Sequence, residues 1–206
     1  MLKQAYTLWA PLYDLMLEAP TRAARRRSLA LLGDVRQRKI VIAGVGTGLD
    51  FPHLRAGAHY TGIDLTPAML DKARRRARRC GLPIRLIEGD ACALPFADGE
   101  ADVVVLHLIL AVVPNPAEVL AEASRILRPG GQALILDKFL RPGQRAPLRR
   151  AASPLLGRLA TRTDVVFEPL LEAHPELCLR HDAPAFARGW FRHILLEKTP
   201  LQGEPT

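Results

Sequence analysis

The chain has 206 residues, 49% of them hydrophobic, and a formal net charge of +8. This length suits one hydrophobic core of ordinary size and is too short for two independent domains to be expected. The positive charge is compatible with nucleic acid, anionic lipid or phosphorylated partners and does not choose among them. Its three cysteines lack the spacing of a disulfide framework or a metal site, so we expect reduced thiols, no metal and a cytoplasmic location.

The N-terminal region is predicted to be helical. Leu8, Leu12 and Leu15 recur at helical spacing and predict a short amphipathic helix. After Pro20, Thr21 is placed to cap a second helix that carries four arginines and ends near residue 33. We expect residues 1–33 to cover a pocket, to contact a membrane surface, or both, because apolar residues and arginines lie side by side there. No segment reaches the roughly 18 apolar residues that span a bilayer.

The middle of the chain, residues 34–140, alternates between strand and helix patterns. Strands are expected at 39–43, 58–63, 84–88, 101–107 and 132–138, and helices at 67–80 and 116–128. This alternation predicts an α/β domain with a mostly parallel sheet, helices on both faces and right-handed crossovers.

The tail, residues 141–206, is expected to belong to the same domain. Residues 141–162 hold six arginines and no acid. Two candidate strands follow, "CLRHD" and "WFRHILLEK", separated by "APAFARG". We predict a basic insertion and then a terminal β-hairpin.

A glycine turn follows the first strand of this middle region. In "KIVIAGVGTGLDF", residues 39–51, the apolar run leads into Gly44, Gly46 and Gly48. Such a turn places backbone N–H groups at the mouth of a parallel sheet, where a ligand binds. A dinucleotide site prefers glycine at the position of Leu49, and a triphosphate loop needs a lysine followed by serine or threonine, so both are disfavoured.

Two carboxylates complete the pattern of an adenosine site. Asp64 closes the second strand twenty residues after Gly44, where an acid can accept ribose hydroxyls. Asp90 follows the third strand in "EGDACALPF" and is placed to accept an adenine amino hydrogen. The structural alternatives are a helix cap for Asp64 and a turn residue for Asp90.

Four segments, "VIAGVGTGLDF", "YTGIDLTPAMLDKARRRA", "EGDACALPFADGEADVVV" and "EASRILRPGG", resemble in order and spacing the class I S-adenosylmethionine-dependent methyltransferases. The resemblance covers about residues 38–138. It implies a seven-stranded sheet with an antiparallel last strand, and S-adenosylmethionine as the cofactor. The residues it implies as cofactor-binding are Gly44, Val45, Gly46, Gly48, Asp64, Leu65, Asp90, Ala91 and His107.

A more specific likeness concerns the methyl acceptor. "YTLWAPLYDLMLE", "GVGTGLDFPHL", "GIDLTPAML" and "LILAVVPNPAEVLAEASRILRPGG" are similar to the small bacterial phospholipid N-methyltransferases that convert phosphatidylethanolamine toward phosphatidylcholine, and more distantly to the ubiquinone and menaquinone C-methyltransferases. Arginine-rich segments beside apolar residues at 22–27 and 141–162 suit the interface of an anionic membrane, so we expect a peripheral enzyme on its inner face. The alternatives are a soluble or quinone-like acceptor, RNA, or a non-catalytic cofactor binder; with aromatics at 5%, no nucleic-acid partner is expected.

The sequence departs from the class I pattern at Ile42. An acid at this position orders the glycine turn in most class I enzymes, so isoleucine removes a bond worth roughly 1.5–3 kcal/mol. Either another polar group replaces it, such as Asp50 or the hydroxyl of Tyr6 or Tyr13, or the cofactor is bound weakly.

Methyl transfer to a neutral, aligned nucleophile depends mainly on positioning. An alkylammonium acceptor must first lose a proton, and the candidate bases are Tyr13, His107 and Asp137. His107 and Asp137 are expected at strand ends on the carboxyl edge of the sheet, where ligands bind. The structural alternatives are a histidine packed in the core and a structural salt bridge of Asp137.

Overall fold

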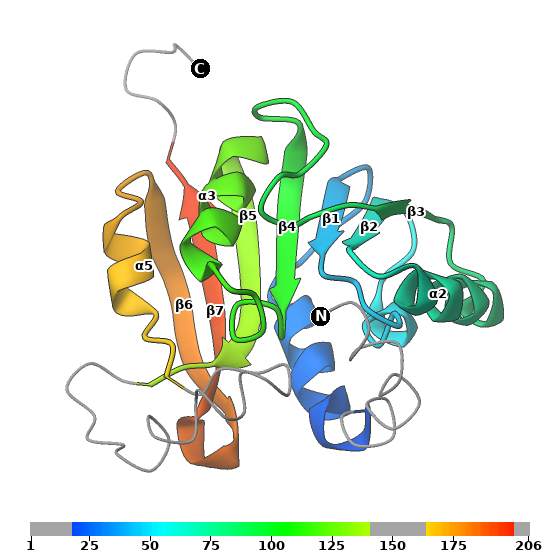
Figure 1. Cartoon of the computed structure of the whole chain (residues 1–206), viewed down its shortest axis with the longest axis horizontal. Coiled ribbons are helices and arrows are strands. Elements are labelled where there is room, and N and C mark those ends of the chain that lie inside the picture. Colours follow the sequence, from blue (N-terminus) through cyan, green and yellow to red (C-terminus); the bar gives the residue numbers. More distant parts are fainter. Residues whose placement is uncertain (1–17, 141–163, 200–206) are drawn as a thin grey trace.

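The computed structural model describes residues 18–140 and 164–199 (Figure 1). The predicted amphipathic helix on Leu8, Leu12 and Leu15 lies outside these ranges, as do Tyr6 and Tyr13. The arginine-rich segment at 141–162 also lies outside them.

Seven strands form a single sheet within the described ranges, in the order β3-β2-β1-β4-β5-β7-β6. The strands are β1 (Lys39–Ala43), β2 (His59–Asp64), β3 (Ile84–Glu88), β4 (Ala101–His107), β5 (Leu127–Lys138), β6 (Leu177–Phe186) and β7 (Phe191–Lys198). Neighbouring strands are parallel except that β7 runs antiparallel to both β5 and β6. The predicted α/β fold and the implied antiparallel last strand are confirmed.

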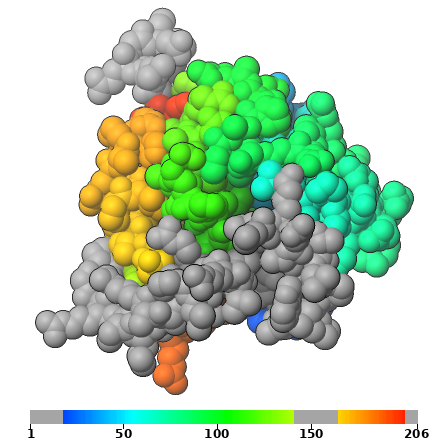
Figure 2. Space-filling model, in the orientation of Figure 1, coloured from blue at the N-terminus to red at the C-terminus, as the bar shows by residue number. Residues whose placement is uncertain are grey.

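Helices cover both faces of the sheet (Figure 1). A helix over residues 18–30, called the N-terminal helix below, and α2 (Pro67–Cys80) pack on one face. The helices α3 (Pro116–Ile126) and α5 (Glu168–Glu172) pack on the other. Short 3₁₀ turns η1 (Phe51–His53) and η2 (Ala187–Gly189) complete the described elements. Figure 2 shows α5 (yellow), α3 (green) and α2 (teal) in that order across the view.

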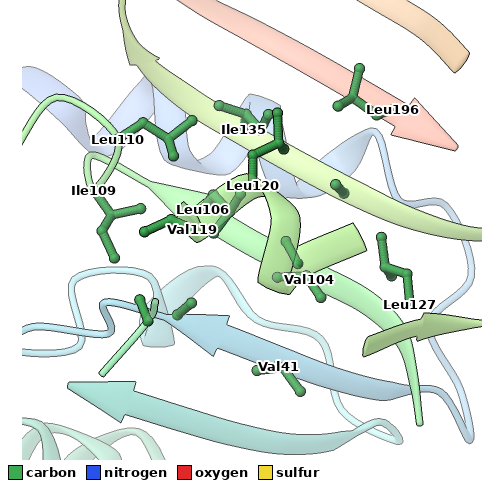
Figure 3. Close-up of a cluster of buried hydrophobic side chains, with 14 of the residues drawn as sticks. Val41, Val104, Leu106, Ile109, Leu110, Val119, Leu120, Leu127, Ile135 and Leu196 are labelled. Atoms are coloured by element: carbon green, nitrogen blue, oxygen red, sulfur yellow. The ribbon is translucent and has the colours of Figure 1, made fainter. Parts of the chain in front are cut away.

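The alternation of side chains along β1 explains the two layers of core. Val41 and Ala43 belong to the cluster under α3, part of which Figure 3 shows. Ile40 and Ile42 belong to the cluster under the N-terminal helix and α2. Successive side chains of a strand point to opposite faces, so a central strand covered on both faces is apolar throughout.

Local signals define both ends of α2. Pro67 occupies the first turn, where its missing N–H is not needed. Gly81 ends the helix in the left-handed conformation, with φ of 60°, and its N–H donates to the carbonyls of Ala77 and Arg78. The predicted bounds of this helix, 67–80, are confirmed.

Several predicted boundaries were wrong. The N-terminal helix already covers residues 18–20, so Thr21 lies inside it and does not cap it. Leu127 is extended and pairs with Ala101, which ends α3 at Ile126 and brings "RPGG" into β5. Strand β6 continues to Phe186 through most of "APAFARG", because register shifts against β7 absorb the irregularity.

Candidate active site

A cavity of about 410 Å³ lies at the carboxyl ends of β1, β2, β3 and β4. Its walls are the glycine turn after β1, residues 64–66 after β2, residues 89–92 after β3 and the segment after β4. Cavities of this size hold drug-sized or cofactor-sized ligands, and the carboxyl ends of parallel strands are where such folds bind them.

Two glycines shape the turn that forms one wall. Gly44 has φ of +70°, and a Cβ there would overlap the side chain of Ile109 on the opposite wall. Gly46 has φ of +55°, and a Cβ there would meet no heavy atom within 4 Å, so this position faces the open cavity. The turn therefore leaves room for a ligand to approach the backbone.

Asp64 is held at the cavity by two backbone donors. Gly46 N–H donates to Oδ2 at 2.8 Å, and Thr66 N–H donates to Oδ1 at 2.9 Å. Burial raises the pKa of Asp64, while both hydrogen bonds favour the charged form. Each oxygen keeps a further lone pair, so the carboxylate is able to accept two ligand hydroxyls.

The third wall combines Asp90 with apolar groups. Asp90 Oδ1 accepts the N–H of Cys92 at 2.9 Å, so this residue shapes its turn and also lines the cavity. The buried Ala91 of this wall offers apolar contact, as does Leu65 of the second wall, which is 42% exposed. Burial raises the pKa of the Cys92 thiol to about 11, so the thiol is protonated at neutral pH.

Of the nine residues predicted to bind the cofactor, six line the cavity: Gly44, Gly46, Asp64, Leu65, Asp90 and Ala91. Val45 belongs to the cluster under the N-terminal helix and α2, and a Cβ at Gly48 would overlap the ring of Phe51. His107 is buried behind the wall that Leu108 and Ile109 form.

His107 belongs to a buried polar chain that joins three parts of the fold. Asp50 Oδ1 accepts hydrogen bonds from His107 Nδ1 at 2.8 Å and from Arg25 Nη1 at 2.9 Å. Ser28 Oγ lies 3.0 Å from His107 Nε2. A carboxylate only accepts, so Nδ1 carries the proton, and Nε2 shares a hydrogen bond with the serine hydroxyl. Burial alone raises the pKa of Asp50, but Arg25 and His107 hold it below the usual range.

Asp137 is buried at the end of β5 and holds the segment that forms the fourth wall. Its Oδ2 accepts the N–H of Ala111 at 3.1 Å, and its Oδ1 accepts the N–H of Lys138 at 2.8 Å. Burial raises the pKa of Asp137 to about 6. Its role as a base, like that of His107, stays a prediction, and Tyr13 lies outside the described residues.

The fourth wall was missing from the predicted site. Residues after β4 contribute much of the apolar lining: Leu108, Ile109, Val112, Val113 and Pro114, with Asn115 and Glu118 at the start of α3. The signal that marks it is "LILAVVPNP", an apolar run that directly follows a strand and ends in two prolines. In this fold, segments that follow strands line the ligand site.

A second hollow, of about 570 Å³, lies between the end of α2 and the start of β3. It includes Gly81, Leu82 and Ile84, with Arg74 and Arg78 from α2. This is the amino edge of the sheet, and none of the described residues that line the hollow is a carboxylate, so the cavity at the carboxyl edge is the candidate site.

Comparisons with known proteins agree with this geometry. The sequence profile described as "Methyltransferase domain" matches residues 41–135. A phosphatidylethanolamine N-methyltransferase of Cereibacter sphaeroides is 31% identical over 198 residues, which cover 95% of this chain and 96% of that protein. With the fold and the site, these matches show that the chain belongs to the class I S-adenosylmethionine-dependent methyltransferases, and S-adenosylmethionine is its cofactor.

Two further likenesses differ in extent. A demethylmenaquinone methyltransferase of Thermus thermophilus is 36% identical over 135 residues, covering 62% of this chain and 61% of that protein. Among solved structures, a methyltransferase in complex with the Haloferax volcanii Trm112 methyltransferase activator superposes with a TM-score of 0.77 at 17% identity, covering 95% of this chain and 98% of that one. At that identity the structural likeness shows the fold.

The residues present fit the cofactor. The open position at Gly46 leaves space for a ligand beside the turn, and Asp64 keeps acceptor capacity for two hydroxyls. Asp90, Leu65 and Ala91 combine an acceptor with an apolar surface, as an adenine ring requires.

Proposed function

We propose that the protein methylates the amine of phosphatidylethanolamine and of its partly methylated forms, as a cytoplasmic enzyme resting on the inner face of an anionic membrane. One observation carries this proposal. The phosphatidylethanolamine N-methyltransferase aligns over 95% of this chain, whereas the quinone methyltransferase of Thermus thermophilus aligns over 62%. Sequence similarity that extends beyond the cofactor-binding core supports a shared methyl acceptor.

The charge of the N-terminal helix supports contact with an anionic surface. Arg22, Arg26 and Arg27 are exposed, whereas Arg25 is buried. Basic side chains near an anionic bilayer contribute about 1 kcal/mol each to binding. Within residues 18–140 and 164–199, no helix has the length and apolar character that crossing a bilayer requires.

The cofactor supplies a methyl group on a positively charged sulfur. The protein must place the acceptor nitrogen in line with that group, exclude water and take up the proton of an ammonium. Tyr13, His107 and Asp137 are the proposed candidates for the last step. Asp137, with its pKa near 6, is charged at neutral pH, although both of its oxygens already accept backbone hydrogen bonds.

The test is methyl transfer to defined vesicles. Purified protein with radiolabelled S-adenosylmethionine is expected to label phosphatidylethanolamine, and to label it faster when the vesicles also contain phosphatidylglycerol. Added salt should slow labelling by screening the arginines. Replacing both Arg22 and Arg26 with glutamine should reduce vesicle binding and leave binding of S-adenosylhomocysteine unchanged.

A soluble or quinone-like acceptor is the second candidate, which the 36% identity to the demethylmenaquinone methyltransferase favours. The same assay with demethylmenaquinone in place of the phospholipid distinguishes the two. If phosphatidylethanolamine stays unlabelled while the quinone is labelled, the phospholipid proposal is wrong. Binding of S-adenosylhomocysteine without transfer to either acceptor would exclude both of these candidates.

A further inference from the structure

We propose that the buried chain Arg25–Asp50–His107–Ser28 couples cofactor binding to docking of the N-terminal helix, and that it orders the glycine turn in place of the acid absent at Ile42. This inference concerns the cofactor, so it does not depend on which acceptor is methylated. Arg25 and Asp50 are positioning residues here, because neither lines the cavity.

The hydrogen-bonded side chains of Asp50 and His107 join two walls of the cavity from behind. Asp50 lies two residues after Gly48, at the end of the glycine turn. His107 immediately precedes Leu108 and Ile109, which line the opposite wall. The 2.8 Å hydrogen bond between His107 and Asp50 therefore fixes the separation of the two walls. A shift of either residue moves a surface that lines the cavity.

The two other members of this hydrogen-bonded set, Arg25 and Ser28, lie on one face of the N-terminal helix. Thr21, Arg25 and Ser28 are spaced four and three residues apart, so they share a face of the helix. Arg25 Nε donates to Thr21 Oγ1 at 3.1 Å, while Arg25 Nη1 reaches Asp50 at 2.9 Å. The helix is thus attached to the glycine turn through Arg25 and to β4 through Ser28.

The side chains that attach the N-terminal helix to the glycine turn are buried. The side chains of Arg25, Asp50 and His107 are 7%, 4% and 1% exposed. Removing one partner of a buried ion pair leaves an uncompensated charge, which is strongly unfavourable. The turn therefore keeps its conformation while the helix is docked, and undocking the helix leaves Asp50 without its cationic partner.

Ile42 does not provide such a link. Its side chain is 1% exposed and packs with Leu29, Val45 and Phe51, so it points into the core beneath the turn. Of the replacements considered for the missing acid, Asp50 is the one that the described residues place beside the turn. It fixes the turn through the helix and β4, not by facing the cavity.

Coupling between two events is reciprocal. If docking of the helix strengthens cofactor binding by some factor, the cofactor stabilises the docked helix by the same factor. Two independent measurements therefore test one quantity: the affinity for S-adenosylhomocysteine by calorimetry, and the rate of amide hydrogen exchange in residues 18–30 with and without that ligand.

The decisive variants are Arg25→Met and Asp50→Asn, with Arg192→Met as the matched control. Arg192 is as buried as Arg25 and is paired with Glu168 and Asp182, but it lies on β7 away from the cavity. All three are expected to lower the melting temperature. Only Arg25→Met and Asp50→Asn should weaken the affinity for S-adenosylhomocysteine, by tenfold or more, while Arg192→Met stays within twofold of the wild type.

In the wild type, S-adenosylhomocysteine should slow hydrogen exchange in residues 18–30 by at least threefold, and this effect should vanish in Asp50→Asn. Ser28→Ala removes a single hydrogen bond, to His107 Nε2, and keeps the test available if the charged variants fail to fold. It should weaken the affinity by two- to fivefold. Unchanged affinity in the folded variants, or exchange in residues 18–30 that is insensitive to the ligand in the wild type, would overturn the proposal.

Discussion

Replacing Ile42 with glutamate is expected to destabilise the protein severely, although it restores the residue type that most class I methyltransferases have at this position. The Ile42 side chain is 1% exposed among Leu29, Val45 and Phe51. Losing its burial costs about 1.5–3 kcal/mol. A buried glutamate must also be kept neutral at pH 7, which costs about 4 kcal/mol relative to its ordinary pKa of about 4.3. The total is comparable with the whole stability of a domain.

Urea unfolding measures this effect, with Ile42→Val as the control that changes volume alone. The control is expected to lose about 0.5–1.5 kcal/mol at any pH. The glutamate variant should lose far more, and its deficit should grow as the pH rises above about 4, because the folded state holds a proton that the unfolded state releases. A variant as stable as the wild type that binds S-adenosylhomocysteine more tightly would refute this reasoning, because the carboxylate would then reach the turn.

Three other substitutions test the site and its supports. Asp64→Ala should weaken S-adenosylhomocysteine by about 1.5–3 kcal/mol in calorimetry, and an unchanged affinity would exclude Asp64 as the ribose acceptor. Burial raises the pKa of Asp137 from 3.8 to about 6, so the wild type should lose stability as the pH rises from about 4 to 6. In urea unfolding, Asp137→Asn should remove that dependence of stability on pH. Burial lowers the pKa of His193, whose Nε2 donates to the carbonyl of Ala24, so stability should be lost as the pH falls below about 6.5. His193→Gln should make stability less dependent on pH in this range. An equal dependence in the variant and the wild type would contradict this prediction.

The sequence carried the information about the core of the fold because its signals there are local. An apolar run that ends in glycines defines β1 and its turn, and Pro67 with Gly81 defines both ends of α2. Asp64 ends β2 and Asp90 follows β3, so the parallel topology places both at one edge without further information. The boundary at Leu127 failed because this residue pairs with Ala101 of β4, and that pairing overrides the local helical pattern. The boundary at Thr21 failed because the helix already includes residues 18–20.

Only the tertiary structure decided which polar residues act together. Arg25 stands in a run of arginines that is indistinguishable in composition from a solvated surface, and only its contact with Asp50 in the folded protein shows that it is buried while Arg26 and Arg27 are exposed. Asp50 and His107 are separated by 57 positions and meet because the ends of β1 and β4 are neighbours in the sheet. Ile42 belongs to the core for a long-range reason as well. The alternation of side chains along β1 fixes which face of the sheet Ile42 occupies, but it is buried because the N-terminal helix and α2 pack on that face. Residue identity and spacing determined the cofactor class, whereas long-range packing determined how the cofactor turn is held.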